Sequence, residues 1–135
     1  LAPFECLCGN FILPEPASYV FFYAIFNLRN LLYIIPASRP VIAAKRDNMD
    51  EYDTIFVGFP IWWYIAPTII NTFLESYNLK GKTVITFATS GGSGMGKTNE
   101  KLTPSCPGAK LLHGKVFNSY SSKADLSAWV ETISL

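Results

Sequence analysis

Two short stretches of the chain carry the residue types best suited to holding a ligand. Residues 60–67 are PIWWYIAP, with three consecutive aromatic side chains, and residues 89–96 are TSGGSGMG. Aromatic faces stack on flat rings, and glycine leaves its backbone N–H groups open to a ligand because it has no side chain. Together the two stretches predict a slot for a flat heterocycle with a polar edge. Taken singly, each has a plainer interpretation, because large apolar residues usually fill a core and glycines usually form turns.

A rival motif overlaps the glycine-rich stretch. Residues 91–98, GGSGMGKT, satisfy the pattern G-x-x-x-x-G-K-[ST] of phosphate-binding loops. Such a loop opens a long helix, whereas Pro104 follows six residues after Thr98. The strand expected at 110–118 also ends without an acidic residue that could hold magnesium. Nucleotide binding through this loop is therefore the less favoured alternative.

Groups for acid–base, nucleophilic or metal chemistry are sparse. The chain has one histidine, His113, and three cysteines, Cys6, Cys8 and Cys106, which form no CxxC pair. No cationic partner is evident that would make Cys106 a thiolate. We therefore expect no catalytic side chain and no metal site. We interpret the cysteines as thiols of a reducing, cytoplasmic compartment.

Three apolar runs are typical of strands that are covered on both faces, at residues 54–59, 82–89 and 110–118. Helical patterns alternate with them, which indicates an α/β protein with a parallel sheet and helices on both faces. In such a sheet the loops that leave the carboxyl ends of the strands lie along one edge, where ligands bind. Since the aromatic and glycine-rich stretches leave two successive strands, we expect them to be neighbours.

Helices are expected at residues 68–77, 98–102 and 123–133. In the first, apolar residues recur at helical spacing, whereas Asn71 and Glu75 fall on the face that points away from the core. Ser122 is placed to cap the last helix.

Composition limits the classes of protein to consider. The 135 residues suit one domain. Half of all residues are apolar and only 16% are charged, which excludes a disordered chain. Eleven Lys and Arg against ten Asp and Glu give a net charge of +1. This balance does not support a nucleic-acid partner, because nucleic-acid binders usually have a marked basic excess.

The N-terminal residues differ from the rest of the chain. Residues 17–36 are mostly apolar and long enough for a bilayer, which takes about 20 residues. Arg29 lies near their middle, and an arginine there costs about 2.5–3.5 kcal/mol on insertion scales. We therefore expect a buried or interface segment and no membrane span. The chain divides into an atypical apolar segment, 1–37, and an α/β domain, 38–135.

Residues 38–135 resemble the flavodoxin-like family of small bacterial FMN-binding proteins. The resemblance rests on YDTIFVGFPIWW at 52–63 and FATSGGSG at 87–94. It implies a three-layer α/β fold, with a five-stranded parallel sheet of order 2-1-3-4-5 and FMN at its carboxyl edge. It also implies that two loops contact the isoalloxazine ring through Pro60, Ile61, Trp62, Trp63 and Tyr64 on one side and Thr89, Ser90, Gly91, Gly92 and Ser93 at the pyrimidine edge.

One part of the family pattern is absent from the sequence. Family members begin with a strand and a loop of the form S-x-T-G-N-T around the FMN phosphate, and residues 1–37 do not contain this motif. The first strand and the phosphate loop are therefore expected to be missing or replaced. The N-terminal residues could fill the gap in an unusual way, a second copy of the chain could complete the sheet as a homo-oligomer, or the sequence could be a fragment.

The resemblance implies an FMN protein of electron transfer or redox chemistry. A carrier that serves a partner protein is favoured over an FMN-dependent oxidoreductase, because a carrier needs no catalytic base. The alternative is a truncated flavodoxin-like module that no longer binds FMN and serves in protein–protein interaction.

Overall fold

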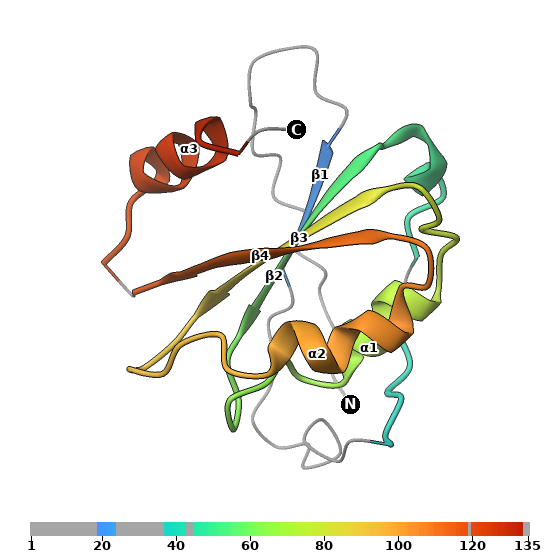
Figure 1. The fold of residues 1–135 in the computed structure, drawn as a ribbon, viewed down its shortest axis with the longest axis horizontal. Coiled ribbons are helices and arrows are strands. Elements are labelled where there is room, and N and C mark those ends of the chain that lie inside the picture. The colour runs from blue at the N-terminus through green and yellow to red at the C-terminus, as the bar shows by residue number, and fades with distance from the viewer. Residues whose placement is uncertain (1–18, 24–36, 43–44, 119, 134–135) are drawn as a thin grey trace.

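The computed structural model describes residues 19–23, 37–42, 45–118 and 120–133. Within them, the strands form one parallel sheet in the order β1-β2-β3-β4, with helices packed on it (Figure 1). The strands are β1 Tyr19–Tyr23, β2 Thr54–Pro60, β3 Thr83–Thr89 and β4 Lys110–Phe117. The helices are α1 Ile69–Glu75, α2 Thr98–Leu102 and α3 Lys123–Glu131, with short 3-10 turns η2 Met49–Glu51 and η3 Thr103–Ser105. The predicted alternation of strands and helices from residue 54 onward is confirmed.

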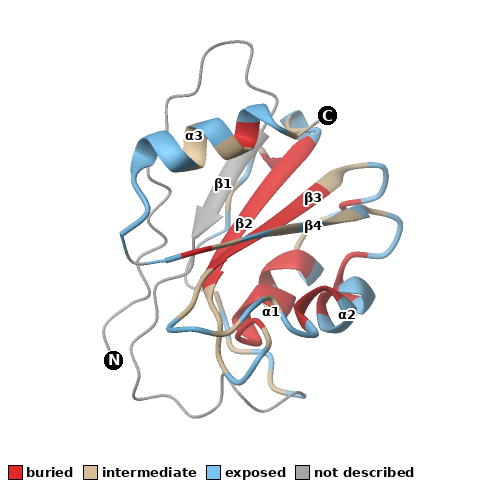
Figure 2. Ribbon diagram, turned by 60° about the vertical axis from the view of Figure 1, so that its left-hand side comes forward, coloured by how far each residue is buried: buried red, intermediate tan, exposed pale blue. Residues whose placement is uncertain are grey.

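The two faces of the sheet bury two separate apolar clusters. Successive side chains of a strand point to opposite faces, and in β2 the residues Ile55, Val57 and Phe59 pack in the cluster shared with α1 and α2. Phe56, between them, packs in the other cluster with Val130 of α3. All four β2 side chains are fully buried. A run without polar alternation therefore reflects a sheet covered on both faces, as predicted (Figure 2).

Trp129 of α3 makes the ring contacts between this helix and the second face of the sheet. Its ring centroid lies 5.4 Å from that of Phe117 and 5.9 Å from that of Phe56, both in edge-to-face geometry. The expected Ser122 cap is present as a capping box, in which the Ser122 hydroxyl accepts from the Asp125 N–H and the Asp125 carboxylate accepts from the Ser122 N–H. The cap fixes where α3 begins, and the ring contacts fix how it lies on the sheet.

In the family order 2-1-3-4-5, the first strand lies next to the third, and β2 occupies the place of the third. In this chain the neighbour of β2 on that side comes from the N-terminal segment. β1 pairs in parallel with β2, from Tyr19 opposite Thr54 to Tyr23 opposite Gly58. The first strand is thus replaced by YVFFY, and part of segment 1–37 belongs to the same sheet as the rest of the chain. The expected loss of the phosphate loop concerns residues that lie outside those described. Among the described residues, no helix is long and apolar enough to cross a membrane.

A β-bulge in β4 anchors α2. Leu112 pairs with Ile85 and Lys115 with Phe87, so β4 has one more residue than β3 over this interval. The buried Asn99 of α2 donates to the Leu112 carbonyl oxygen at 3.0 Å and accepts from the Thr86 hydroxyl at 3.0 Å. These two bonds hold the start of α2, directly after the glycine-rich stretch, against the sheet.

The expectation that Asn71 faces away from the core is wrong. Asn71 is 8% exposed, and its amide donates to the Ser105 hydroxyl at 2.9 Å and the Lys101 carbonyl oxygen at 3.2 Å. Ser105 donates in turn to Glu75 at 2.7 Å, and Arg39 forms an ion pair with the same carboxylate at 2.9 Å. Ser105 of η3 offers Asn71 a hydrogen-bond partner on this side of α1, so the Asn71 amide can be buried. The helix also ends at Glu75, two residues before the expected Tyr77.

Glu75 gives a pH dependence of stability. The hydrogen bond from Arg39 is the largest cause that lowers the pKa of Glu75, the bond from Ser105 adds to it, and desolvation opposes both. A carboxyl group whose pKa is lower in the folded state stabilises the fold above its unfolded pKa, and this contribution is lost as pH falls through the folded pKa. We expect Glu75→Gln to reduce the free energy of unfolding at pH 7 by less than about 1 kcal/mol, because the pair is largely exposed to solvent.

The difference in the free energy of unfolding between Glu75→Gln and the unsubstituted protein should shrink as pH falls below about 4. Urea unfolding at pH 7 and pH 3 measures it, with substitution of the exposed Glu100 of α2, Glu100→Gln, as the matched control. A difference that stays the same at both pH values would contradict the assignment.

Candidate functional site

The aromatic and glycine-rich stretches lie side by side at the carboxyl edge of the sheet. Pro60, the last residue of β2, is the register partner of Thr89, the last residue of β3. One residue further, the Ile61 N–H donates to the Thr89 carbonyl oxygen at 2.8 Å. The two loops therefore leave the sheet next to each other, as the parallel order predicted.

The aromatic stretch forms a tight two-residue turn with an unusual backbone. Trp62 and Ile65 exchange two backbone hydrogen bonds, of 3.0 and 3.1 Å, around Trp63 and Tyr64. The φ angles of Trp63 and Tyr64 are 51° and 66°. Turns with positive φ at both central positions favour Asn-Gly, because a left-handed backbone costs a residue with a side chain about 1–2 kcal/mol. The chain thus holds two bulky aromatic residues in a strained turn.

The burial of the aromatic residues divides them into two groups. Ile61 and Trp62 are partly buried and pack against the core cluster on the α1 side, so the core interpretation applies to them. Trp63 and Tyr64 are 78% and 67% exposed. Contacts within the chain therefore cover little of these two rings. Strain of this kind is concentrated at ligand clamps and active sites.

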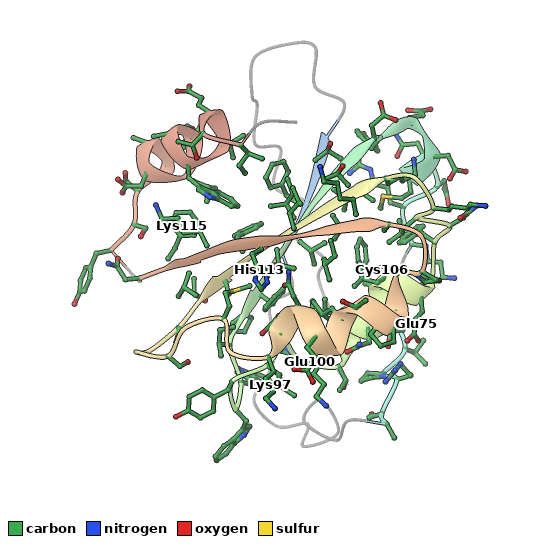
Figure 3. The ribbon with its side chains drawn as sticks, viewed as in Figure 1. Glu75, Lys97, Glu100, Cys106, His113 and Lys115 are labelled. Atoms are coloured by element: carbon green, nitrogen blue, oxygen red, sulfur yellow. The ribbon has the colours of Figure 1, made fainter. Side chains whose placement is uncertain are left out.

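Gly96 and Lys97 hold the turn in place. The Lys97 N–H donates to the Tyr64 carbonyl oxygen at 3.3 Å. Gly96 has a φ of +52°, and a Cβ at this position would overlap the Tyr64 carbonyl oxygen. Figure 3 shows Lys97 at the end of the molecule where the β2–α1 loop turns. The glycine-rich pattern by itself predicts this role for neither residue, although the fourth glycine of the stretch is a signal for it.

The glycine-rich stretch is organised by Ser90. Its hydroxyl oxygen accepts from the N–H groups of Gly92 at 3.2 Å and Ser93 at 2.8 Å, and it lies 2.8 Å from the Ser93 hydroxyl oxygen. A Cβ added to Gly91 or Gly94 would meet nothing within 4 Å. The outer surface of the loop is therefore open, and it presents hydrogen-bond donors next to exposed aromatic rings.

The electrostatic character of the edge is simple. Residues 60–68 and 89–97 contain one charged side chain, that of Lys97. The two loops contain no Asp or Glu, so no carboxylate from them repels electron-rich atoms of a ligand. The edge thus combines apolar ring surface with N–H and O–H donors, which suits a flat ring whose rim carries acceptors.

The structure gives little support to the phosphate-binding alternative. α2 has five residues and passes directly into η3. Thr98, whose hydroxyl would face a bound metal ion in such a motif, is fully buried. The loop lacks the long helix and the accessible hydroxyl that phosphate binding of this type requires.

Cys106 is a buried thiol among the described residues. Burial raises the pKa of the Cys106 thiol, which disfavours the reactive thiolate. In the described part of the chain no group of three or more His, Cys, Asp or Glu residues is placed to hold a metal ion.

Comparisons with known proteins agree with this architecture. The family model described as flavodoxin matches residues 33–133. A crystal structure of a "putative flavoprotein" from Bacteroides eggerthii is 42% identical, has a TM-score of 0.66, and is matched over 75% of this chain and 63% of its own. Another, of a protein given the same description from Bacteroides uniformis, is 43% identical with a TM-score of 0.66, over 73% and 62%. This chain spans less than two thirds of the length of either. No curated protein matches.

Replacement of Gly96 by alanine tests the contact between the loops. Gly96→Ala should lower the free energy of unfolding by more than about 1 kcal/mol, the strain of a left-handed alanine, since the overlap with Tyr64 adds to it. Gly94→Ala, two residues away and in open space, is the control and should stay within about 0.5 kcal/mol of the unsubstituted protein. Urea unfolding measures both. Equal stability of the two variants would show that the loops are not in contact.

Proposed function

The chain belongs to the flavodoxin family, and on this premise we propose that it binds the isoalloxazine ring of FMN at the carboxyl edge of the sheet and transfers electrons through it. The observation that carries the proposal is the strained turn at Trp63 and Tyr64, which exposes two aromatic faces beside an open, donor-rich loop. The names of both solved relatives also point to a flavin.

The residues of the edge fit the ring half of FMN. Exposed aromatic faces provide stacking surface, and glycines without neighbours on their outer side leave room for a ring edge. The residues that would hold the ring are Pro60, Ile61, Trp62, Trp63 and Tyr64 from the β2–α1 loop and Thr89, Ser90, Gly91, Gly92 and Ser93 from the β3–α2 loop. The phosphate half would have to be held by residues outside those described.

FMN supplies one- and two-electron redox chemistry when it is bound, and the protein tunes it. The aromatic turn would exclude water from one side of the ring. Apolar surroundings disfavour a negative charge on the reduced ring, whereas the N–H and O–H donors of residues 89–93 favour it. The two loops contain no His, Cys, Asp or Glu. A carrier needs no such group, so we favour a cytoplasmic electron carrier with a partner protein over an FMN-dependent oxidoreductase.

The proposal is tested by the visible spectrum of the purified protein and by titration of FMN while its fluorescence is followed. Flavin absorbance bands and quenched emission are expected. Riboflavin, which has the same ring without the phosphate, should also bind, because the contacts proposed for the described residues are all with the ring. A colourless protein that leaves FMN fluorescence unchanged at high micromolar concentration would overturn the proposal and favour the interaction-module alternative.

Trp63→Gly should separate folding stability from flavin binding. Glycine accepts the left-handed backbone without strain, so the free energy of unfolding without FMN should rise by about 1 kcal/mol. Loss of the ring should weaken FMN binding by about 1 kcal/mol, or roughly fivefold. Trp63 is more informative than Trp62, which also packs on the core.

The control for Trp63→Gly is Trp63→Phe, which keeps both the ring and the strain. It should keep most of the FMN affinity and should not gain stability. Urea unfolding and FMN titration measure the two properties. Unchanged FMN affinity in Trp63→Gly would remove the aromatic turn from the binding site.

A further inference from the structure

The left-handed turn at Trp63 and Tyr64 is not selected by its own hydrogen bonds. Trp62 and Ile65 exchange two backbone bonds around it, and the same pair of bonds also closes two-residue turns whose central residues have negative φ. The bridge between Trp62 and Ile65 is isolated, so it does not join paired strands whose twist would favour the left-handed form. Relaxation to negative φ would relieve the strain, and a contact from outside the turn has to oppose it.

The outside contact comes from the start of α2. The Lys97 N–H donates to the Tyr64 carbonyl oxygen at 3.3 Å, which is longer than the usual value of about 3.0 Å. Lys97 is the N-cap residue of α2, and among the described residues no side chain caps this end. A helix of five residues has little stability of its own. The position of the Lys97 N–H therefore depends on what holds α2 to the sheet.

Asn99 holds this end of α2. Its side chain is 9% exposed, and both ends of its amide bond to the sheet. The Asn99 oxygen accepts from the Thr86 hydroxyl of β3, and its nitrogen donates to the Leu112 carbonyl oxygen of β4, each at 3.0 Å. Because Asn99 lies two residues after Lys97, these bonds fix the first turn of α2 relative to two strands.

The neighbouring contacts of α2 do not have this role. Thr98 is fully buried, but within the described part of the chain its hydroxyl has no hydrogen-bond partner, so it contributes packing alone. Asn71 bonds to the Lys101 carbonyl oxygen, towards the other end of α2. These two residues allow a specific role of Asn99 to be separated from general support of the helix.

We infer that Asn99 is a positioning residue for the aromatic turn. It clamps the start of α2 to β3 and β4, and the clamped Lys97 N–H keeps Trp63 and Tyr64 left-handed, with their rings exposed. A ring surface that is held in place beforehand avoids the cost of ordering it when a ligand binds. The consequence for flavin binding rests on the proposed function, whereas the consequence for the turn needs no ligand.

The test uses four variants of the full chain: Asn99→Ala, Thr86→Val, Thr98→Val and Asn71→Ala. Asn99→Ala removes both bonds of the clamp. Thr86→Val removes one of them and keeps the shape of the side chain, so it carries the test if Asn99→Ala does not fold. Thr98→Val and Asn71→Ala are the matched controls. Without FMN, nuclear magnetic resonance measures the backbone couplings that report the sign of φ in the turn and the amide exchange of Lys97. FMN titration measures affinity.

Asn99→Ala should shift the φ angles of Trp63 and Tyr64 toward negative values and should make amide exchange at Lys97 faster. Thr86→Val should produce the same changes to a smaller extent. FMN binding should weaken by up to about fivefold in Asn99→Ala, the ratio expected for loss of the Trp63 ring itself. The two controls should change neither the turn nor the affinity.

A double substitution tests whether Asn99 acts through the turn. In Trp63→Gly the ring is already absent, so adding Asn99→Ala should weaken FMN binding less than Asn99→Ala does alone. Effects of residues that are coupled in this way do not add. Equal weakening in both backgrounds would show that Asn99 does not act through Trp63 and would overturn the inference.

Failure of this inference and failure of the proposed function are distinguishable. If the unsubstituted protein does not bind FMN, the proposed function fails, and the sign of φ in Asn99→Ala still decides the role of Asn99. If the turn stays left-handed and Lys97 exchange is unchanged in Asn99→Ala, the inference is overturned, whatever the FMN affinity. It is also overturned if Thr98→Val or Asn71→Ala loosens the turn as much, because the effect would then be general loosening of α2.

Discussion

The contact between the β2–α1 and β3–α2 loops is the constraint on which the rest of the edge depends. Parallel pairing of β2 and β3 continues one residue beyond the strands, through the Ile61 N–H and the Thr89 carbonyl oxygen. A second link joins the Tyr64 carbonyl oxygen to the Lys97 N–H, where only glycine fits at position 96. With both links in place, the backbone of the aromatic turn and that of the glycine-rich loop are tied to each other at two points.

The strain in the aromatic turn is tolerated because buried elements flank the turn and the glycine-rich loop is bonded to it. Two left-handed aromatic residues cost a few kcal/mol together, which is a substantial part of the stability of a domain of this size. The turn lies between a strand that is buried up to Phe59 and a helix whose inner face is buried, and the glycine-rich loop is bonded to the turn at Tyr64. The rings of Trp63 and Tyr64 are largely exposed, so packing within the chain does not explain why these residues adopt a strained backbone. Such strain is typical of functional sites.

Two buried amides position the helices that follow the loops. Asn71 links α1 to Ser105 and to the end of α2, and Asn99 links α2 to the bulge of β4. Each amide is largely satisfied by hydrogen bonds, which is the condition for burying a polar group without a large cost. The Asn99 bonds tie the start of α2 to the sheet, where the β3–α2 loop ends, and the Asn71 bonds tie α1 to α2 and η3.

The sequence by itself determined the parallel sheet from residue 54 onward, the Ser122 cap and the two stretches at the carboxyl edge, because these depend on apolar patterning and on chain order alone. Only the tertiary structure decided the strand at Tyr19–Tyr23, since a short apolar run suits a strand, a helix or a membrane segment equally well. It also decided the burial of Asn71, the left-handed turn at Trp63 and Tyr64 and the support from Gly96. Each of these depends on a partner far away in the sequence, and a pattern of neighbouring residues carries no information about such a partner.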